Sequence, residues 1–233
     1  MRGALVCLSL VSLYLLAYRA PLLEAGYVWE DGYWVDEPHV SQPVLLGAPR
    51  SLTRFSFTLQ RGTSPMAHHA VNVVLGLIVA ALVATWLLLL GLSRGAALAG
   101  SAVMLWHPMA VEAIAQVAAR AELVAAVFVV AACVLAMLGQ RSWIATKMAT
   151  VCALLAVLGK EIGFVACLAV PAMLACAGAW RRAAIMAVAV MVAGYVLWWD
   201  NLTALAAWAQ NGSGGLNNVS QLTAAEWLGW QAT

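Results

Sequence analysis

This sequence has little charge for its length. Across 233 residues, lysine, arginine, aspartate and glutamate together account for 9%, whereas hydrophobic residues account for 64%. The mean hydropathy is +0.90. A water-soluble globule of this size needs more polar surface than such a composition provides. The sequence therefore excludes a soluble globular protein and predicts a chain whose surroundings are largely lipid.

Several motifs of soluble enzymes are also missing. The sequence has no Gly-rich phosphate loop, no GxSxG motif, no helical repeat and no soluble domain of substantial size. Its basic residues are scattered among apolar runs and form no patch. Nucleic acid is therefore excluded as a partner, and partners are expected in the bilayer and at its surface.

Cysteine is present without the spacing of a disulfide framework or a metal site. No CxxC occurs, and no histidine stands at ligand spacing from a cysteine. All five cysteines lie inside apolar stretches, which favours small core residues over disulfides or metal ligands. They are Cys7, Cys133, Cys152, Cys167 and Cys176.

Long apolar runs are what the sequence has instead. About seven of them approach the length that crosses a hydrocarbon core of roughly 30 Å. The predicted fold class is therefore an all-α polytopic membrane protein with about seven transmembrane helices. A secretory signal is the alternative for the first run, because Arg2 precedes it and small residues follow near Ala20 and Ala25. The runs cover residues 3–19, 68–92, 96–118, 121–139, 143–159, 162–180 and 183–199.

The short loops between these runs predict the orientation of the chain. Basic residues fall in alternate loops, as expected when positive charge is retained in the cytoplasm. The N-terminus is then cytoplasmic, and a membrane core of residues 1–200 contains a long first extracytoplasmic loop at 20–67. Residues 201–233 form an extracytoplasmic tail. The basic positions are Arg2, Arg94, Arg141 with Lys147, and Arg181 with Arg182.

Carboxylates gather on the predicted outer side. Residues 26–40, GYVWEDGYWVDEPHV, hold four of the ten acids in the chain. A solvated outer surface is one interpretation, and a polar cleft that opens outward is the other. The cleft is favoured by Glu112, which lies inside an apolar run, and by Arg120, which shares its broad helix face if one helix continues between them. Lys160 and Glu161 stand next to each other with almost no loop to hold them in water.

The histidines are weaker evidence for a site. No pair has the HxxxH or HxH spacing that places metal ligands on one face. Polar interfacial or packing roles are therefore favoured over binding of a metal or haem. The four are His39, His68, His69 and His107.

Five stretches, in a fixed order, carry a resemblance to a known family. They are GYVWEDGYWVDEPHV, PRSLTRFSFTL, MAHHAVNVVLGLIVA, LWHPMAVEAIAQVAARAELVAAVFV and LLAVLGKEIGFVACLAVP. In this order the chain resembles the polytopic GT-C glycosyltransferases. Within these it is most similar to the membrane half of the transmembrane and tetratricopeptide-repeat O-mannosyltransferases and their bacterial relatives. The resemblance covers roughly residues 1–182, and the block from HPxxxEA to RxE is its most specific part.

The chain also departs from the pattern of that family. Glu30 and Asp31 stand where two aspartates are usual, and PRSL replaces a tighter RPL motif. Gly76 stands where a histidine commonly follows the HxxN motif of the second helix. Family members carry further membrane helices, and many carry soluble repeats. The resemblance therefore implies a shortened member of the family or a piece of a longer protein.

The resemblance implies a reaction for residues 26–40, which we call the acidic loop. GT-C enzymes pass a sugar from a polyprenyl-phosphate carrier to an acceptor on the outer side, usually with inversion. A carboxylate accepts the proton of the attacking hydroxyl, and the resemblance implies Asp31 for this role. Glu30 is its neighbour, orienting the acceptor or raising the proton affinity of the base by like-charge repulsion.

The same resemblance implies cations for the departing lipid phosphate, whose negative charge grows as the sugar leaves. The implied phosphate-binding residues are Arg120, Lys160 and Arg50. Carboxylates nearby are expected to hold these cations in place, and the histidine of the HxxN motif has a supporting role. No cofactor is implied, and a divalent metal is not indicated. The supporting residues are Glu112, Glu122, Glu161 and His69.

The implied partners are a polyprenyl-phosphate sugar lipid, a protein or glycan acceptor, membrane lipids and other membrane subunits. Two other functions are weighed beside the transferase. One is a non-catalytic membrane subunit of the same ancestry, packed in a larger complex. The other is a lipid or sugar transporter that uses its acids as a relay. The loop aromatics Tyr27, Trp29, Tyr33 and Trp34 fit either interfacial anchors or a wall that stacks on a sugar ring.

Overall fold

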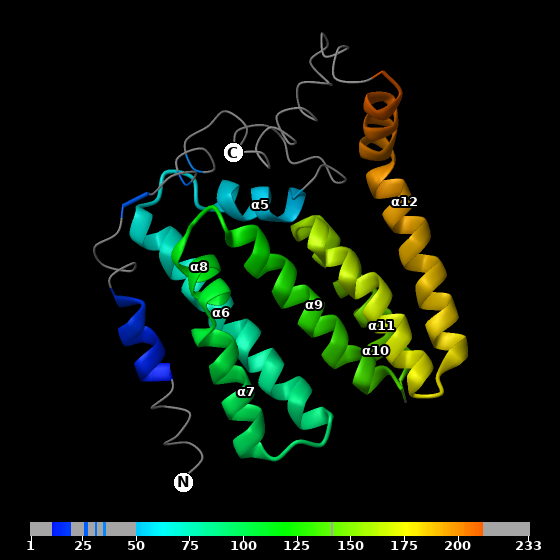
Figure 1. Ribbon diagram of the computed structural model, residues 1–233, viewed down its shortest axis with the longest axis horizontal. Coiled ribbons are helices and arrows are strands. Elements are labelled where there is room, and N and C mark those ends of the chain that lie inside the picture. Colours follow the sequence, from blue (N-terminus) through cyan, green and yellow to red (C-terminus); the bar gives the residue numbers. More distant parts are fainter. Residues whose placement is uncertain are drawn as a thin grey trace.

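The computed structural model describes residues 11–19, 26–27, 31, 35, 50–140 and 142–211, with side chains up to residue 196. All regular structure among these residues is helical (Figure 1). A helix over residues 11–17 comes first. The labelled elements that follow are α5 (Ser51–Leu59), α6 (Pro65–Leu89), α7 (Arg94–Trp106), α8 (Pro108–Ala115), α9 (Arg120–Gly139), α10 (Trp143–Gly159), η1 (Glu161–Gly163), α11 (Phe164–Cys176) and α12 (Trp180–Asn211).

Two of the described helices are long and apolar enough to cross a bilayer. They are α6, with 25 residues, and α9, with 20 residues. The count rises to three if α7 and α8, which are bent by 60°, form one broken crossing. The all-α class is therefore confirmed for the described residues, together with a composition that suits a membrane. The number of about seven crossings stays a prediction.

The predicted apolar run at 96–118 is not one continuous helix, and this corrects the sequence analysis. Pro108 is the first residue of α8 and has no backbone N–H to donate to α7. Its ring also disfavours helical geometry in the residue before it. His107 accordingly takes an extended conformation, with φ −64° and ψ 134°, and its Nδ1 accepts a hydrogen bond from Met109 N at 3.3 Å. The chain therefore bends where the sequence has HP.

Serine side chains mark the start of several helices. Ser64, Ser93 and Ser142 each accept a hydrogen bond from a backbone N–H three residues on, at 3.3–3.4 Å. Each of these bonds satisfies a donor that the first helical turn leaves without a partner. Helix α6 begins at Pro65, inside the predicted loop at 20–67, because a proline suits the first position after such a cap. At the other end of the chain, α12 continues past residue 200 to Asn211.

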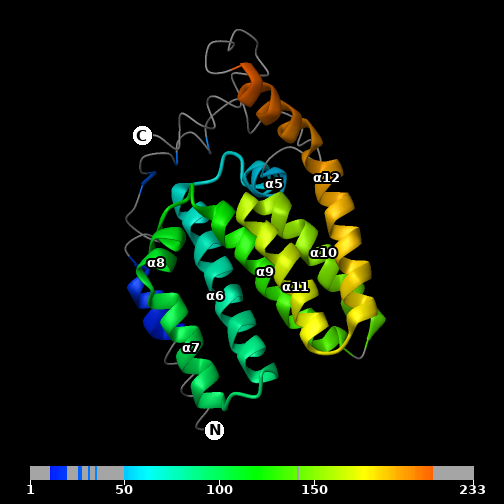
Figure 2. The same cartoon turned by 45° about the vertical axis from the view of Figure 1, so that its right-hand side comes forward.

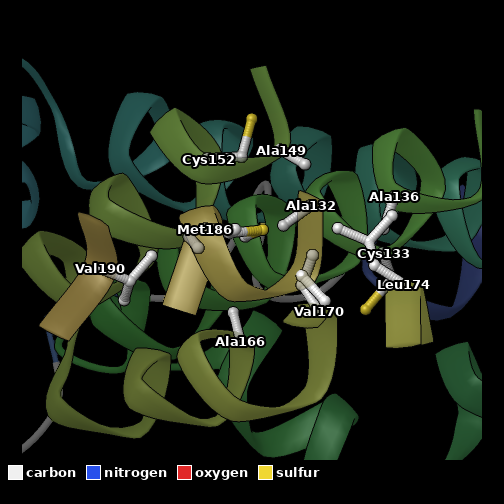
Figure 3. Packing of buried hydrophobic residues seen from close by; sticks show 12 residues of the cluster. Ala132, Cys133, Ala136, Ala149, Cys152, Ala166, Val170, Leu174, Met186 and Val190 are labelled. Carbon is white, nitrogen blue, oxygen red and sulfur yellow. The ribbon is translucent and has the colours of Figure 1, made fainter. Parts of the chain in front are cut away.

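Small side chains fill the contact between α9, α10, α11 and α12 (Figure 3). Alanine and cysteine predominate on α9 and α10, so their backbones approach closely, as is common between helices in membranes. Cys133 and Cys152 are buried there, as the sequence analysis predicted, whereas Cys176 is exposed at the end of α11. The labelled members of this core are Ala132, Cys133, Ala136, Ala149, Cys152, Ala166, Val170, Leu174, Met186 and Val190.

The helices of the bundle run alternately up and down, which sorts their connections to two ends (Figures 1 and 2). One end carries the connections α6–α7, α9–α10 and α11–α12, and we call it the basic end. The opposite end carries the start of α9 and the α10–α11 turn, and α5 lies across it in contact with both α9 and α10. We call this second end the site end. Arg94, Arg181 and Arg182 lie at the basic end, away from Glu122 and Glu161 at the site end.

The outward faces of the bundle are apolar. Leu168 on α11 is 77% exposed, Ile144 on α10 is 76% exposed and Val103 on α7 is 68% exposed. Side chains of this size rarely cover a continuous surface in water, because their hydration is unfavourable. The described residues therefore have an apolar outer surface, which suits contact with lipid.

Candidate functional site at one end of the bundle

Two glycines shape the α10–α11 turn, GKEIG, at the site end. A Cβ atom on Gly159 would lie 3.0 Å from Ala125 N of α9, and one on Gly163 would lie 2.2 Å from the carbonyl carbon of Ala156. Real Cβ atoms do not come as close as 2.2 Å to a backbone atom. Glycine at these positions therefore lets the turn press against α9 on one side and fold back onto α10 on the other.

The close approach of the turn to α9 brings two oppositely charged side chains together. Lys160 Nζ donates a hydrogen bond to Glu122 Oε1, in the first turn of α9. The lysine side chain is 24% exposed and the glutamate 42% exposed, so the pair faces partly outward. Glu122 also suits its place, because a negative charge is favourable at the N-terminus of a helix.

A second ion pair ties α5 to the same turn. Arg50 Nε donates to Glu161 Oε1 at 3.3 Å, and the arginine Nη2 lies 3.5 Å from Glu161 Oε2. Arg50 precedes α5 with φ 56°, a left-handed conformation that is uncommon outside glycine. Thr53 Oγ1 donates to Gly159 O at 2.9 Å. α5 is therefore held against the GKEIG turn by the ion pair between Arg50 and Glu161, which has two N–O contacts, and by the buried hydrogen bond from Thr53.

Arg120 lies in a buried polar network between α6 and α9. Its side chain has no exposed surface. Nε donates to Asn72 Oδ1 at 2.9 Å, and Nη2 donates to His68 O at 3.1 Å and lies 3.2 Å from His68 Nδ1. The guanidinium carbon is 4.2 Å from the ring centroid of Phe57, on α5. A charge this far from water is costly unless it is fully hydrogen-bonded, and this network supplies much of that bonding.

Asp31 is buried beside the same network. Its Oδ1 accepts a hydrogen bond from Ala118 N at 2.7 Å, and the residue has no exposed surface. Asn72 Nδ2 donates to Gln116 O at 2.7 Å. Both contacts fall on the short connection between α8 and α9, just before Arg120. The acidic loop and α6 therefore share the task of holding this connection in place.

The sequence placed Glu112 and Arg120 on one helix face only if one helix continues between them, and the structure does not meet that condition. The helix ends at Ala115 and restarts at Arg120, with an extended residue at Gln116 between them. Glu112 is exposed on α8 and joins neither ion pair, whereas Arg120 points into the core. The extended connection turns the chain so that the two charges diverge.

His69, predicted as a supporting residue, is also buried. Its Nε2 lies 3.4 Å from Gly26 O, and its Nδ1 has no hydrogen-bond partner within the described residues. Two turns further along α6, a Cβ atom on Gly76 would lie 2.5 Å from Tyr14 Oη, which donates to Val73 O at 3.1 Å. A larger residue at position 76 would therefore collide with Tyr14, which explains why this chain has glycine there.

Four residues of this end were not named as site residues from the sequence: His68, Asn72, Phe57 and Thr53. His68 and Asn72 stand four residues apart, which places them on one face of α6, and this spacing was a usable signal. Nothing in the sequence indicated that Phe57 would lie under Arg120. Glu30, predicted as the neighbour of the base, lies outside the described residues.

The arrangement joins a buried carboxylate to two partly exposed cations through one short helix. α5 contacts the Arg120 network through Phe57 and the GKEIG turn through Arg50 and Thr53. In the part of the chain that the structure describes, no three His, Cys, Asp or Glu side chains are grouped to hold a metal. The chemistry that these residues can offer is proton acceptance by Asp31 and anion binding by Lys160 and Arg50.

Comparison with protein-family models, curated proteins and solved structures finds no match to this chain. What the protein does must therefore be inferred from its own residues and their geometry.

Proposed function

We propose that this protein is a membrane glycosyltransferase that moves a sugar from a polyprenyl-phosphate donor to an acceptor hydroxyl at the site end, with inversion. The single observation that carries the proposal is the grouping at one end of the bundle. Buried Asp31 lies by the start of α9, and Lys160 and Arg50 are held beside the same helix end by Glu122 and Glu161. The resemblance of the sequence to GT-C glycosyltransferases supports the same function.

Each group has a distinct task in this proposal. The acceptor oxygen attacks the anomeric carbon, Asp31 takes the hydroxyl proton, and the bond from that carbon to the phosphate oxygen breaks. The polyprenyl phosphate leaves with the bonding electrons, and its growing negative charge is stabilised by Lys160 and Arg50. Because Asp31 is fully buried, the residues around it must open to admit the acceptor.

Arg120 takes a different part from Lys160 and Arg50, which are partly exposed. Its guanidinium is enclosed by Asn72, His68 and Phe57, so direct contact with a lipid phosphate requires that this network opens. In the closed arrangement, Arg120 fixes the start of α9 two residues after the backbone N–H that holds Asp31. We propose that it positions the base and adds positive charge behind it.

We expect the parent protein in liposomes to transfer labelled sugar from a polyprenyl-phosphate donor to a soluble acceptor. Lys160→Gln should raise the donor KM by about tenfold, because a charged hydrogen bond to phosphate is lost. kcat should fall as well, because Lys160 also stabilises the charge that grows on the leaving phosphate. Arg94→Gln, which removes one exposed cation from the basic end, is the matched control and should leave both constants unchanged. Equal KM values for Lys160→Gln and Arg94→Gln would rule out Lys160 as a phosphate ligand.

The proposed topology places the site end outside and the basic end in the cytoplasm, with the N-terminus cytoplasmic. Cys176 is exposed at the basic end, and Arg61 is exposed at the site end. In intact cells, a membrane-impermeant maleimide should label Arg61→Cys, built on Cys176→Ala, and should label Cys176 only after lysis. The positive-inside pattern of the loops is the reason. The reverse labelling pattern would place the site on the cytoplasmic side.

One observation favours a second candidate, a non-catalytic membrane subunit. Lys160 and Arg50 are already paired with carboxylates, and Arg120 is enclosed, so all three also fit a purely structural role. The assay separates the two functions. A folded parent that transfers no sugar from any polyprenyl-phosphate donor, and that co-purifies with a larger membrane complex, would favour the subunit.

A further inference from the structure

Among the described residues, positive charge at the basic end has no negative charge beside it. The sequence has no aspartate or glutamate in residues 38–111, 123–160 or 162–199. The connections α6–α7, α9–α10 and α11–α12 all fall within these stretches. The described basic side chains at this end therefore have no carboxylate from the adjoining helix ends, in contrast to Lys160 and Arg50 at the site end. Their counter-charge must come from outside these elements.

Arg182 joins the starts of α10 and α12 at this end. It donates a hydrogen bond from Nη1 to Gly139 O, at the last residue of α9, and its guanidinium carbon lies 5.0 Å from the ring centroid of Trp143. Thr146 Oγ1 also donates to Gly139 O, at 3.2 Å. The Arg182 side chain is therefore occupied by contacts within the bundle, and these contacts fix the start of α12 next to the start of α10.

Two exposed cations lie next to this fixed point. Lys147 follows Trp143 by four residues and shares its face of α10. Arg181 adjoins Arg182 in α12, and both Lys147 and Arg181 are exposed. Helical side chains tilt toward the N-terminus of their helix, which for α10 and α12 is the basic end. Both charged groups are thus directed to the end of the bundle, where a long side chain in an apolar helix reaches the membrane surface.

Apolar stripes continue from these cations along both helices. On α12, Ile185, Val188 and Val192 follow Arg181 at helical spacing on one face, and all three are exposed. On α10, the corresponding exposed stripe is Ile144, Met148 and Val151. Trp143 and Trp180 are exposed at the same level as the cations, where indole rings are favoured at a membrane–water interface. A ligand that matches this surface has an anionic head and long apolar chains.

We propose that Lys147 and Arg181, with Trp143 and Trp180 beside them, form a binding site for the headgroup of an anionic phospholipid. The acyl chains lie along the exposed stripes of α10 and α12. The stripes favour a lipid over a soluble anion, which would use the cations alone. The site lies at the opposite end of the bundle from Asp31 and does not depend on glycosyl transfer.

The test is lipid binding to the full chain in detergent, measured by native mass spectrometry with phosphatidylglycerol and with phosphatidylcholine. The parent should prefer phosphatidylglycerol. Arg181→Gln and Lys147→Gln should each lower its affinity by about fivefold, the typical contribution of one basic residue at an anionic surface. Arg181→Lys should keep most of the affinity, and the preference should decrease as salt is added. Arg61→Gln, which removes an exposed arginine from the site end, is the matched control.

Three results would overturn the proposal. The first is equal binding of the two lipids by the parent. The second is an equal loss in Arg61→Gln and Arg181→Gln, which would indicate an effect of net charge alone. The third is competition by glycerol phosphate as effective as by the intact lipid, which would show that the apolar stripes play no part. Lys147 and Arg181 are exposed, so their substitution should leave the fold intact. Circular dichroism of each variant checks this.

Discussion

Asp31→Asn should lower the rate of sugar transfer by about a hundred- to ten-thousand-fold, the usual loss for a positioned general base. The substitution isolates the chemistry, because an asparagine side-chain oxygen can still accept the hydrogen bond from Ala118 N while the amide takes up no proton. The measurement is transfer from a polyprenyl-phosphate donor in liposomes, with kcat and KM determined separately. kcat should carry most of the loss.

Two controls distinguish the base from its loop. Asp36→Asn and Glu37→Gln remove other carboxylates of residues 26–40 and should change the rate far less. Asp31→Ala, by contrast, also removes the acceptor for the buried Ala118 N–H, and an unsatisfied buried donor costs about 1–3 kcal/mol of folding stability. Equal activity in Asp31→Asn and the parent, with Asp31→Ala destabilised, would show that Asp31 serves the fold and is not the base.

Gly163→Ala should lower the free energy of unfolding by about 3 kcal/mol or more, because overpacking against backbone cannot be relieved by a rotamer change. The new Cβ would lie 2.2 Å from both the carbonyl carbon and the oxygen of Ala156, and 2.5 Å from Val157 N. To make room, α11 must move away from the end of α10. Thermal unfolding in detergent, followed by circular dichroism, measures the loss.

Gly95→Ala is the matched control for this substitution. Gly95 lies in α7, and nothing comes within 4 Å of a Cβ atom built on it. Alanine has the higher helix propensity, so this variant should be as stable as the parent or up to about 1 kcal/mol more stable. If Gly163→Ala unfolds at the same temperature as Gly95→Ala, the turn does not pack as the structure describes. A displaced turn should also reduce donor binding, because Lys160 lies within it.

Much of the helical architecture could be read from the sequence. Apolar composition and run length predicted helices in a lipid-like environment, and each predicted run beyond residue 67 coincides with helical structure. One of these runs, residues 96–118, is two helices and not one. Hydropathy averages over a window and is insensitive to the direction of the backbone, whereas Pro108 acts on a single hydrogen bond and bends the chain by 60°. The proline was visible in the sequence, but its geometric effect was not.

For the candidate site, the sequence by itself determined which charges needed an explanation. Charged residues in an apolar chain are costly, so Glu112, Arg120, Lys160 and Glu161 stood out by composition and position alone. Asp31 was singled out by the resemblance to GT-C glycosyltransferases. Only the tertiary structure decided their partners. Lys160 meets Glu122 because glycine at 159 lets the turn approach α9 closely, and Arg50 meets Glu161 because α5 lies across the end of the bundle. Such contacts join residues 38 and 111 positions apart, and no local pattern encodes a distance of that kind.

The two ends of the bundle also show which features the sequence determined and which the tertiary structure decided. The sequence determined that acids and bases alternate along the chain, because hydropathy and charge are local properties. Only the packing of antiparallel helices converted this alternation into one end with paired charges and one end without carboxylates among the described residues. It also enclosed Arg120 instead of exposing it, because α5 and α6 together supply an aromatic face and three hydrogen-bonding atoms at one point in space. Burial is a property of what packs around a residue, and that is fixed only when distant segments meet.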